Sequence, residues 1–415
     1  MTARVRSSSW KWWVCGLLLL ASTINYMDRQ TLANAATRIS REFQLSQEQY
    51  GNFEFVFGWA FAIGSLLFGI AVDRVSVWWL YPVVLFLWSA VGFATGLTDS
   101  YSGLLICRTF LGFFEGGHWP CAVKTTQRLL VSRDRAMGNS VLQSGTSIGA
   151  ILTPLIMRAM LTDTPGSWRM PFQLVGVAGL LWIGLWLALV GKRDLLPAPT
   201  PPSSAPAAGM GKLIFSRRML VLFAVIAAIN TCWQTLRAWL PKFLQEGRGY
   251  AETDTLYFNS LFYVATDVGC IGAGALTLWL ARRGMSVHTA RSRVFLACAA
   301  LSALLLFVSA LPRGWALLAV LLVVGAGALG VFPIYHAFTQ EISAEHQGKV
   351  TGVASIAAWA LAPPAQKFFG RLIDRSGSFD LGLAVAGCLP LVAYAFLWLF
   401  WDPPQSKNSP SHEPA

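Results

Sequence analysis

Apolar stretches of roughly 20 residues recur along the whole chain, separated by short clusters of charged residues. A helix of that length crosses a hydrocarbon core about 30 Å thick. Only helices and closed barrels satisfy every backbone amide inside lipid, and the sequence lacks the alternating pattern of barrel strands. Charged residues make up 13% of the chain, about half of the fraction in soluble proteins. The sequence therefore predicts an all-α, multi-pass protein of the inner or plasma membrane.

Twelve such stretches can be placed, six on each side of a Pro-rich segment. They run approximately over residues 12–37, 47–72, 78–97, 102–129, 136–161, 170–191, 219–244, 253–280, 293–311, 314–340, 348–373 and 381–401. The Pro-rich segment cannot build a core and is typical of a solvated linker. We therefore expect a six-helix bundle at 1–194, a cytoplasmic linker at 195–212, a second six-helix bundle at 213–403 and a disordered tail at 404–415.

The basic residues concentrate in alternate loops. A net charge of +12 would suggest nucleic-acid binding in a soluble protein, but this alternation is the pattern that sets membrane topology. It predicts that both termini are cytoplasmic and that nucleic acid is not a partner. The seven cysteines lack CxxC or Cys/His ligand spacing, so we expect no metal, cofactor or disulfide. We expect a monomer in the lipid bilayer.

Three motifs lie in the first half. Residues 25–30 read NYMDRQ, residues 69–74 read GIAVDR, and residues 108–115 read RTFLGFFE. Together they resemble the major facilitator superfamily, and more closely its anion:cation symporter family of sugar-acid and organic-anion carriers. The resemblance implies two bundles that rock around a site at the membrane midplane. Thr146 and residues 355–360 depart from the family's polar positions, which leaves the exact substrate open.

The second motif is expected to lie at the inner membrane face. Gly69 would allow close helix approach. Asp73 could accept hydrogen bonds from an adjacent helix N-terminus and, with Arg74, take part in gating. The alternative is an ordinary charged loop.

Five ionisable residues of the first half fall at membrane depth: Asp28, Arg29, Glu54, Arg108 and Glu115. Such groups cost several kcal/mol unless they are paired or hydrated, so each is a candidate for function. A guanidinium matches a carboxylate in a bidentate fork, which makes Arg29 the candidate for a substrate carboxylate. The resemblance implies the same role, and implies proton coupling for Asp28 and Glu115. The alternative is a static ion-pair network.

Arg108 and Glu115 are seven residues apart and would share one helix face. Arg108 is therefore expected to hold Glu115, or to release it when the protonation of Glu115 changes. Glu54 matches no motif. It is expected to be an outer-gate partner of Arg29 or Arg108, with a third coupling carboxylate as the alternative. In the second half, Arg237 and Asp267 are expected to form an ion pair, unless Arg237 is a second contact for the anion.

Polar residues within the spans could donate or accept hydrogen bonds with a sugar, or else join helices to each other. These candidates are Asn25, Tyr26, Gln143, Gln234 and Tyr335. Tyr26 lies three residues before Arg29 and should share its face.

These features predict a secondary transporter that moves a small organic anion with protons, most simply a sugar acid such as a hexuronate or aldonate. Three alternatives stay open: an exchanger, a sodium-coupled carrier of a monocarboxylate or phosphate ester, and a transporter-like sensor. An enzyme is not expected, because the HExxH motif is missing from the sequence and a catalytic role would leave the two sets of six predicted spans unexplained.

Overall fold

The computed structural model describes residues 9–195, 216–342 and 356–401. Residues 196–212 of the predicted linker and the predicted tail lie outside these ranges. The first half holds α1 (Trp10–Glu42), α2 (Gln47–Arg74), α3 (Val77–Thr95), α4 (Tyr101–Glu115), α5 (His118–Leu129), α6 (Ser132–Met160), α7 (Arg169–Leu189) and η1 (Lys192–Leu195). The second half holds α9 (Arg217–Lys242), η2 (Phe243–Gly247), α10 (Glu252–Arg282), α11 (Val287–Ser302), η3 (Ala303–Ala310), α12 (Trp315–Gly330), α13 (Phe332–Ile342), α15 (Ala362–Ser376) and α16 (Asp380–Phe400).

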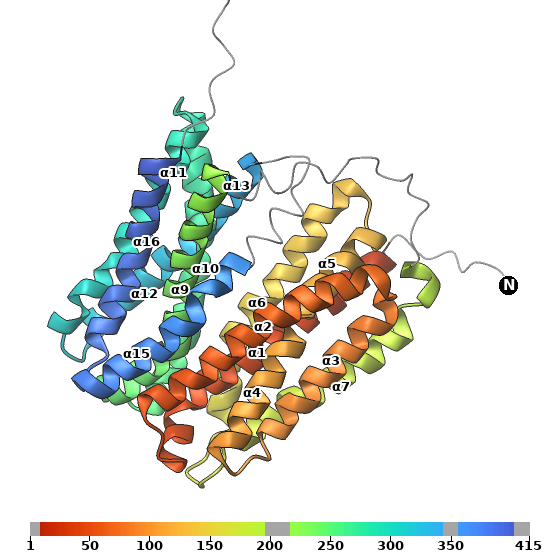
Figure 1. Ribbon diagram of the computed structural model, residues 1–415, viewed down its shortest axis with the longest axis horizontal. Coiled ribbons are helices and arrows are strands. Elements are labelled where there is room, and N and C mark those ends of the chain that lie inside the picture. Colours follow the sequence, from red (N-terminus) through yellow and green to blue (C-terminus); the bar gives the residue numbers. More distant parts are fainter. Residues whose placement is uncertain (1–8, 196–215, 343–355, 402–415) are drawn as a thin grey trace, which may run out of the picture.

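The helices form two bundles that lie side by side, the first half in red to yellow and the second in green to blue (Figure 1). The described residues contain helices and connecting segments but no strand, which confirms the predicted all-α class. Each bundle packs around its own apolar core. A third core cluster contains residues of both halves, among them Tyr50 of α2 and Trp239 of α9.

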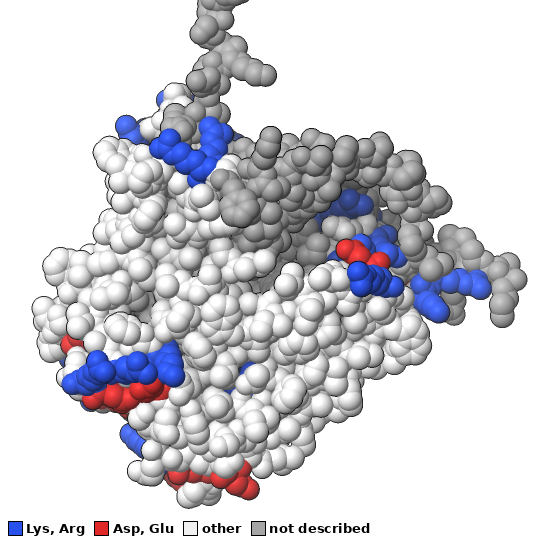
Figure 2. Space-filling view, in the orientation of Figure 1, with Lys and Arg blue, Asp and Glu red and all other residues white. Residues whose placement is uncertain are grey.

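The outer surface suits lipid. Charged side chains gather towards the two ends of the molecule, and a broad uncharged belt lies between them (Figure 2). Large apolar side chains are exposed on the helices, such as Ile63 and Leu66 of α2 and Val268 and Ile271 of α10. Within the described ranges, nine helical segments are long and apolar enough to cross a membrane. The other three predicted spans, which correspond to α1, to α4 with α5, and to the segment that ends in α15, are not among these nine. The number of twelve spans therefore stays a prediction.

Two predicted spans each consist of two α-helices. The span predicted at 102–129 is broken at Gly116 and Gly117, between α4 and α5. A Cβ on Gly116 would lie 2.6 Å from the backbone nitrogen of Ser65 in α2, so a glycine is needed where these helices meet. The second break separates α12 from α13, where Pro333 lacks the N–H that a continuous helix would use.

The halves are tied together at the end where α1 finishes and α2 begins, which we call the closed end. Arg38 of α1 donates two hydrogen bonds to the Glu252 carboxylate of α10, at 2.7 and 2.6 Å. Arg371 of α15 contacts Glu48 of α2 at 2.6 Å. The Asp374 carboxylate accepts the backbone N–H of Glu48 at 2.8 Å, which caps the start of α2. The charge pattern of the loops predicts that these residues lie at the outer face.

We expect the contact between α2 and α4 to be most sensitive to substitution at Gly64 of α2. A Cβ there would lie 2.0 Å from the backbone oxygen of Phe113, whereas Gly69 of the same helix has no described atom within 4 Å of its Cβ position. The expectation that Gly69 permits close helix approach is therefore wrong. We expect Gly64→Leu to lower the melting temperature of the purified protein by more than about 5 °C, because helix backbones cannot yield locally.

Gly69→Leu is the matched control, since it adds the same side chain to the same helix. It should change the melting temperature by less than about 2 °C. Equal melting temperatures for the two variants would contradict the close contact of α2 with α4.

Candidate functional site

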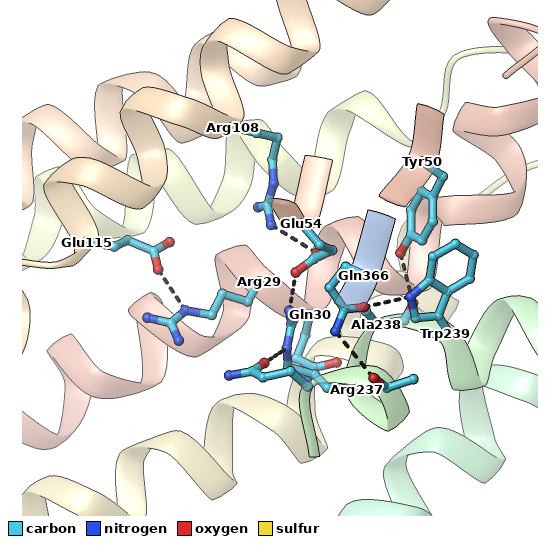
Figure 3. Close-up of polar contacts among 12 residues, drawn as sticks. Arg29, Gln30, Tyr50, Glu54, Arg108, Glu115, Arg237, Ala238, Trp239 and Gln366 are labelled. Atoms are coloured by element: carbon cyan, nitrogen blue, oxygen red, sulfur yellow. Dashed lines mark hydrogen bonds and ion pairs between the residues drawn. The ribbon is translucent and has the colours of Figure 1, made fainter. Parts of the chain in front are cut away.

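Arg29 lies near the middle of α1 with 6% of its surface exposed. Its Nε donates to Oε2 of Glu115, the last residue of α4, at 2.8 Å. Its Nη2 donates to Oδ1 of Asn25 at 3.1 Å. Asn25 precedes Arg29 by four residues, so one turn of α1 puts both side chains on one face. Figure 3 shows the guanidinium of Arg29 directed at the Glu115 carboxylate.

Two aromatic rings of α2 form an apolar wall beside these charges. The guanidinium carbon of Arg29 lies 4.5 Å from the ring centroid of Phe61 and 5.2 Å from that of Phe57. The guanidinium carbon of Arg108 lies 4.4 Å from the same Phe57 ring. Rings in these positions exclude water and strengthen the electrostatic interactions of both cations. They also give a bound molecule an apolar surface to contact.

Glu54 of α2 joins cations from both halves. It accepts a hydrogen bond from Nη2 of Arg108 at 3.2 Å and another from Nη2 of Arg237 in α9 (Figure 3). Glu54 therefore contacts Arg108, one of the two expected partners, and also Arg237, which was not expected. The expectation that Arg108 holds Glu115 is wrong, because Glu115 bonds to Arg29 instead.

The expected ion pair between Arg237 and Asp267 is also wrong. Besides Glu54, Arg237 donates from Nε to Oε1 of Gln234 at 2.7 Å. Asp267 accepts a hydrogen bond from Ser147 of α6 at 2.9 Å. Both residues thus face the first half, and each contributes to contacts between the bundles.

Asp28 is completely buried, next to α3. Neither of its carboxylate oxygens has a hydrogen-bond partner among the described residues. A Cβ on Gly92 of α3 would lie 2.9 Å from Oδ1 of Asp28, so a larger residue there would force this carboxylate to move. Asp28 and Arg29 are adjacent in sequence, but only Arg29 is paired with Glu115.

The remaining candidates lie in different places. Gln234 holds Arg237, as described above, and Tyr26 is partly buried on α1 against Gly149 of α6. Gln143 is exposed on α6. The ring of Tyr335 in α13 packs on Phe332, 5.4 Å away between centroids.

The second motif differs from its predicted arrangement. The Asp73 carboxylate bonds to Lys124 of α5 at 2.5 Å, and in the part of the chain that the structure describes it accepts no hydrogen bond from a helix N-terminus. Arg74 is exposed at the end of α2.

A row of polar residues between α1 and α10 was not recognised from the sequence. Gln30 donates to the Tyr263 hydroxyl at 2.5 Å, and Asn34 accepts from Asn259 at 2.8 Å. Arg38 continues the row to the closed end. The spacing of four residues along α1 could have revealed it, because Gln30, Asn34 and Arg38 must share one helix face.

The cluster as a whole places three guanidinium and three carboxylate groups in one buried region. Arg29, Asp28, Glu54, Arg108, Glu115 and Arg237 are each at most 6% exposed. Ion pairs in such surroundings are costly to desolvate and are weak evidence for stability alone. They can exchange partners with an entering anion, which is what a carrier site requires.

Comparison with known proteins gives three consistent findings. The Major Facilitator Superfamily model matches residues 18–366. A probable L-galactonate transporter of Escherichia coli (strain K12) is 25% identical over 409 residues, which cover 93% of this chain and 88% of that protein. A hexuronate transporter of Bacillus subtilis (strain 168) is 27% identical over 395 residues, which cover 91% of each protein.

The fold also matches a solved structure. A bacterial homologue of the human lysosomal transporter Spinster, in an inward-facing and unoccupied conformation, aligns with a TM-score of 0.79 at 15% sequence identity. The alignment covers 95% of this chain and 97% of the other. At this identity the likeness shows the fold alone.

Proposed function

The chain belongs to the Major Facilitator Superfamily, and from that premise we propose that it carries a small sugar-acid anion, such as a hexuronate or aldonate, together with protons. The family and the relatives are transporters and not enzymes. The names of two relatives, an L-galactonate and a hexuronate transporter, support the class of substrate. We also propose that two six-span bundles alternate in opening the site to each side of the membrane, and that both termini lie in the cytoplasm.

The observation that carries this proposal is the buried pair of Arg29 with Glu115, 2.8 Å apart beside Phe57 and Phe61. A guanidinium of this kind binds a carboxylate through two parallel hydrogen bonds. In this structure the Glu115 carboxylate already occupies one nitrogen of the Arg29 guanidinium. A substrate carboxylate can take the place of Glu115 at low cost only if Glu115 gains a proton, since an unpaired buried anion is strongly unfavourable.

This exchange couples the anion to the proton. A proton on Glu115 releases Arg29, Arg29 then binds the anion, and the anion in turn favours the protonated form of Glu115 by thermodynamic reciprocity. Asp28 would be a second proton carrier, because its carboxylate is buried and neither of its oxygens has a hydrogen-bond partner among the described residues. Asn25 and Tyr26 would contact the substrate beside Arg29. Gln143 and Tyr335 stay candidates for contacts made in another conformation.

We propose that the closed end faces the outside, so that the conformation described here is closed to the exterior. The ion pair of Arg38 with Glu252 and that of Glu48 with Arg371 would then separate when the carrier opens outward. This assignment follows the charge distribution of the loops.

A thermal-shift screen of the purified protein tests the substrate class. Ligands that bind the native state raise the melting temperature, and the rise grows with the logarithm of the ratio of their concentration to the dissociation constant. We expect uronates and aldonates to raise it, and the matching neutral sugars to leave it unchanged, because only the acids engage Arg29. A shift with phosphate esters alone, or with neutral sugars, would contradict the proposal.

A further inference from the structure

A cavity of about 190 Å³ lies in the second half, between α11, α13 and α16. His288, Ser292 and Phe295 of α11 line one side of it, at intervals of four and three residues that put them on one helix face. Phe338 of α13 and Trp401 at the end of α16 line the other side. The Phe338 ring centroid lies 5.8 Å from that of His288 and 5.3 Å from that of Trp401. The cavity is therefore walled mainly by aromatic rings.

This cavity lies at the end of the second half opposite the closed end (Figure 1). Lys242, the last residue of α9, contacts Gln47 of the closed end at 2.8 Å. The first turn of α9 is therefore at the other end, and there the Arg218 guanidinium lies over the Trp401 ring. None of the residues that line the cavity belongs to the cluster around Arg29, so the cavity is separate from the proposed substrate site.

Two buried polar atoms of the cavity wall have no hydrogen-bond partner within the ranges that the structure describes. They are Nε1 of Trp401 and Nδ1 of His288. Trp401 is only 5% exposed, and an indole nitrogen can donate but not accept. Buried donors are normally paired. The wall therefore suits a ligand that brings an acceptor oxygen.

The charges around the cavity indicate that this ligand is an anion. The guanidinium carbon of Arg218 lies 5.8 Å from the Trp401 ring centroid, and that of Arg217 lies 5.8 Å from the Phe400 ring centroid. Arg291 lies on α11 between His288 and Ser292. Figure 2 shows basic side chains gathered at this end of the second half.

The surface beside the cavity faces lipid. Trp398 of α16 lines the cavity and is nevertheless 72% exposed, and Phe396 and Leu399 of the same helix are exposed as well. Tryptophan and arginine at the end of a span are typical of the level of the lipid headgroups. Basic residues at that level attract anionic lipids. An anion that also has apolar chains fits both the arginines and this surface.

We propose that the cavity binds the headgroup of an anionic phospholipid. A phosphate oxygen accepts the N–H of Trp401 beside the guanidinium of Arg218, and the acyl chains run along Trp398 on the outside of α16. If the closed end faces the exterior, the lipid comes from the cytoplasmic leaflet, which is the leaflet rich in anionic lipids. This inference goes beyond the proposed function and does not depend on the substrate.

Native mass spectrometry of the purified, detergent-solubilised protein tests the inference, because it counts bound lipids one at a time. The probes are phosphatidylglycerol and phosphatidylcholine with the same acyl chains. We expect the first phosphatidylglycerol to bind at least about tenfold more tightly than phosphatidylcholine. Arg218→Gln should remove most of this preference. Trp401→Phe keeps a ring and loses the N–H, so it should weaken phosphatidylglycerol binding at least about threefold.

Two controls separate this cavity from general attraction to a basic surface. Arg283→Gln removes a cation that lies over Trp279, 3.9 Å from its ring centroid, outside the cavity. It should change phosphatidylglycerol affinity by less than about twofold. Ser292→Phe puts a ring into the cavity without changing the charge and should abolish tight binding. Leu296→Phe, one turn further along α11 and outside the cavity, should leave binding unchanged.

Equal affinity for the two lipids would overturn the inference, as would equal losses in Arg218→Gln and Arg283→Gln. Binding of glycerol 3-phosphate as tightly as phosphatidylglycerol would also overturn it, because the acyl chains would then contribute nothing. The melting temperature of each variant is measured alongside. If Ser292→Phe does not fold, Trp401→Phe decides the outcome, since it removes only one donor. Failure of sugar-acid binding would contradict the proposed function and leave these lipid measurements unaffected.

Discussion

Replacing Arg29 by alanine is expected to abolish both binding and transport of the substrate. The change removes a buried guanidinium that donates to Glu115 and Asn25 at 2.8 and 3.1 Å, and with it the fork that would hold the substrate carboxylate. Hydrogen bonds to charged groups contribute about 1.5–3 kcal/mol each. Loss of a bidentate contact should therefore weaken binding at least about a hundredfold, measured by titration of the purified protein.

Arg29→Lys is the informative control for this prediction. It keeps the positive charge, and so keeps a partner for Glu115, but it loses the planar fork. We expect intermediate affinity and residual transport. If Arg29→Ala bound substrate within about threefold of the wild type, the substrate carboxylate would have to lie elsewhere, and Arg108 with Arg237 would be the alternative.

Replacing Glu115 by glutamine is expected to separate exchange from accumulation. Glutamine keeps the size of the side chain and an oxygen that can accept from Arg29, but it cannot take up a proton. Proteoliposomes with this variant should still exchange labelled substrate for unlabelled substrate across the membrane. They should lose substrate accumulation driven by a pH gradient, by at least about tenfold, since the coupling between proton and anion is removed.

Glu42→Gln provides the comparison, because Glu42 also pairs with an arginine of the first half, Arg169, at 2.7 Å. That pair lies away from the cluster, so accumulation should stay within about twofold of the wild type. If Glu115→Gln still accumulated substrate against a gradient, another group would carry the proton, and Asp28 would be the first candidate.

Much of the fold could be predicted from the sequence because lipid imposes a strong pattern. The helices lie where the apolar stretches predict them, often within a few residues, as with Gln47–Arg74 and Asp380–Phe400. The break at Gly116 was missed, since it results from the close approach of α2, and hydropathy does not report contacts between helices.

The candidate site could be predicted only in part. The scarcity of charge at lipid depth pointed to Arg29 and Glu115. Their direct pairing was not predicted, because residues on one face of a helix, such as Arg108 and Glu115, need not bond to each other when another helix offers a partner. The contact of Arg237 with Glu54 depends on how two bundles meet, and spacing within one helix does not contain that information.

The relatives and the geometry together support the proposal of a carrier site over a static ion-pair network. A structural network would satisfy its buried groups, whereas here both oxygens of Asp28 and Oε1 of Glu115 have no partner among the described residues. Incomplete pairing of this kind is unfavourable for stability and favours a site whose partners change during function.

The central claim is that a proton and an anion together break the ion pair of Arg29 with Glu115. The most direct test of it is the number of protons that the protein takes up when the anion binds. Calorimetric titrations in two buffers of different ionisation enthalpy give this number for the wild type and for Glu115→Gln. We predict that the wild type takes up about one proton per anion through Glu115 near neutral pH, and that Glu115→Gln binds the same anion without this uptake. Equal proton uptake by the two proteins would contradict the account.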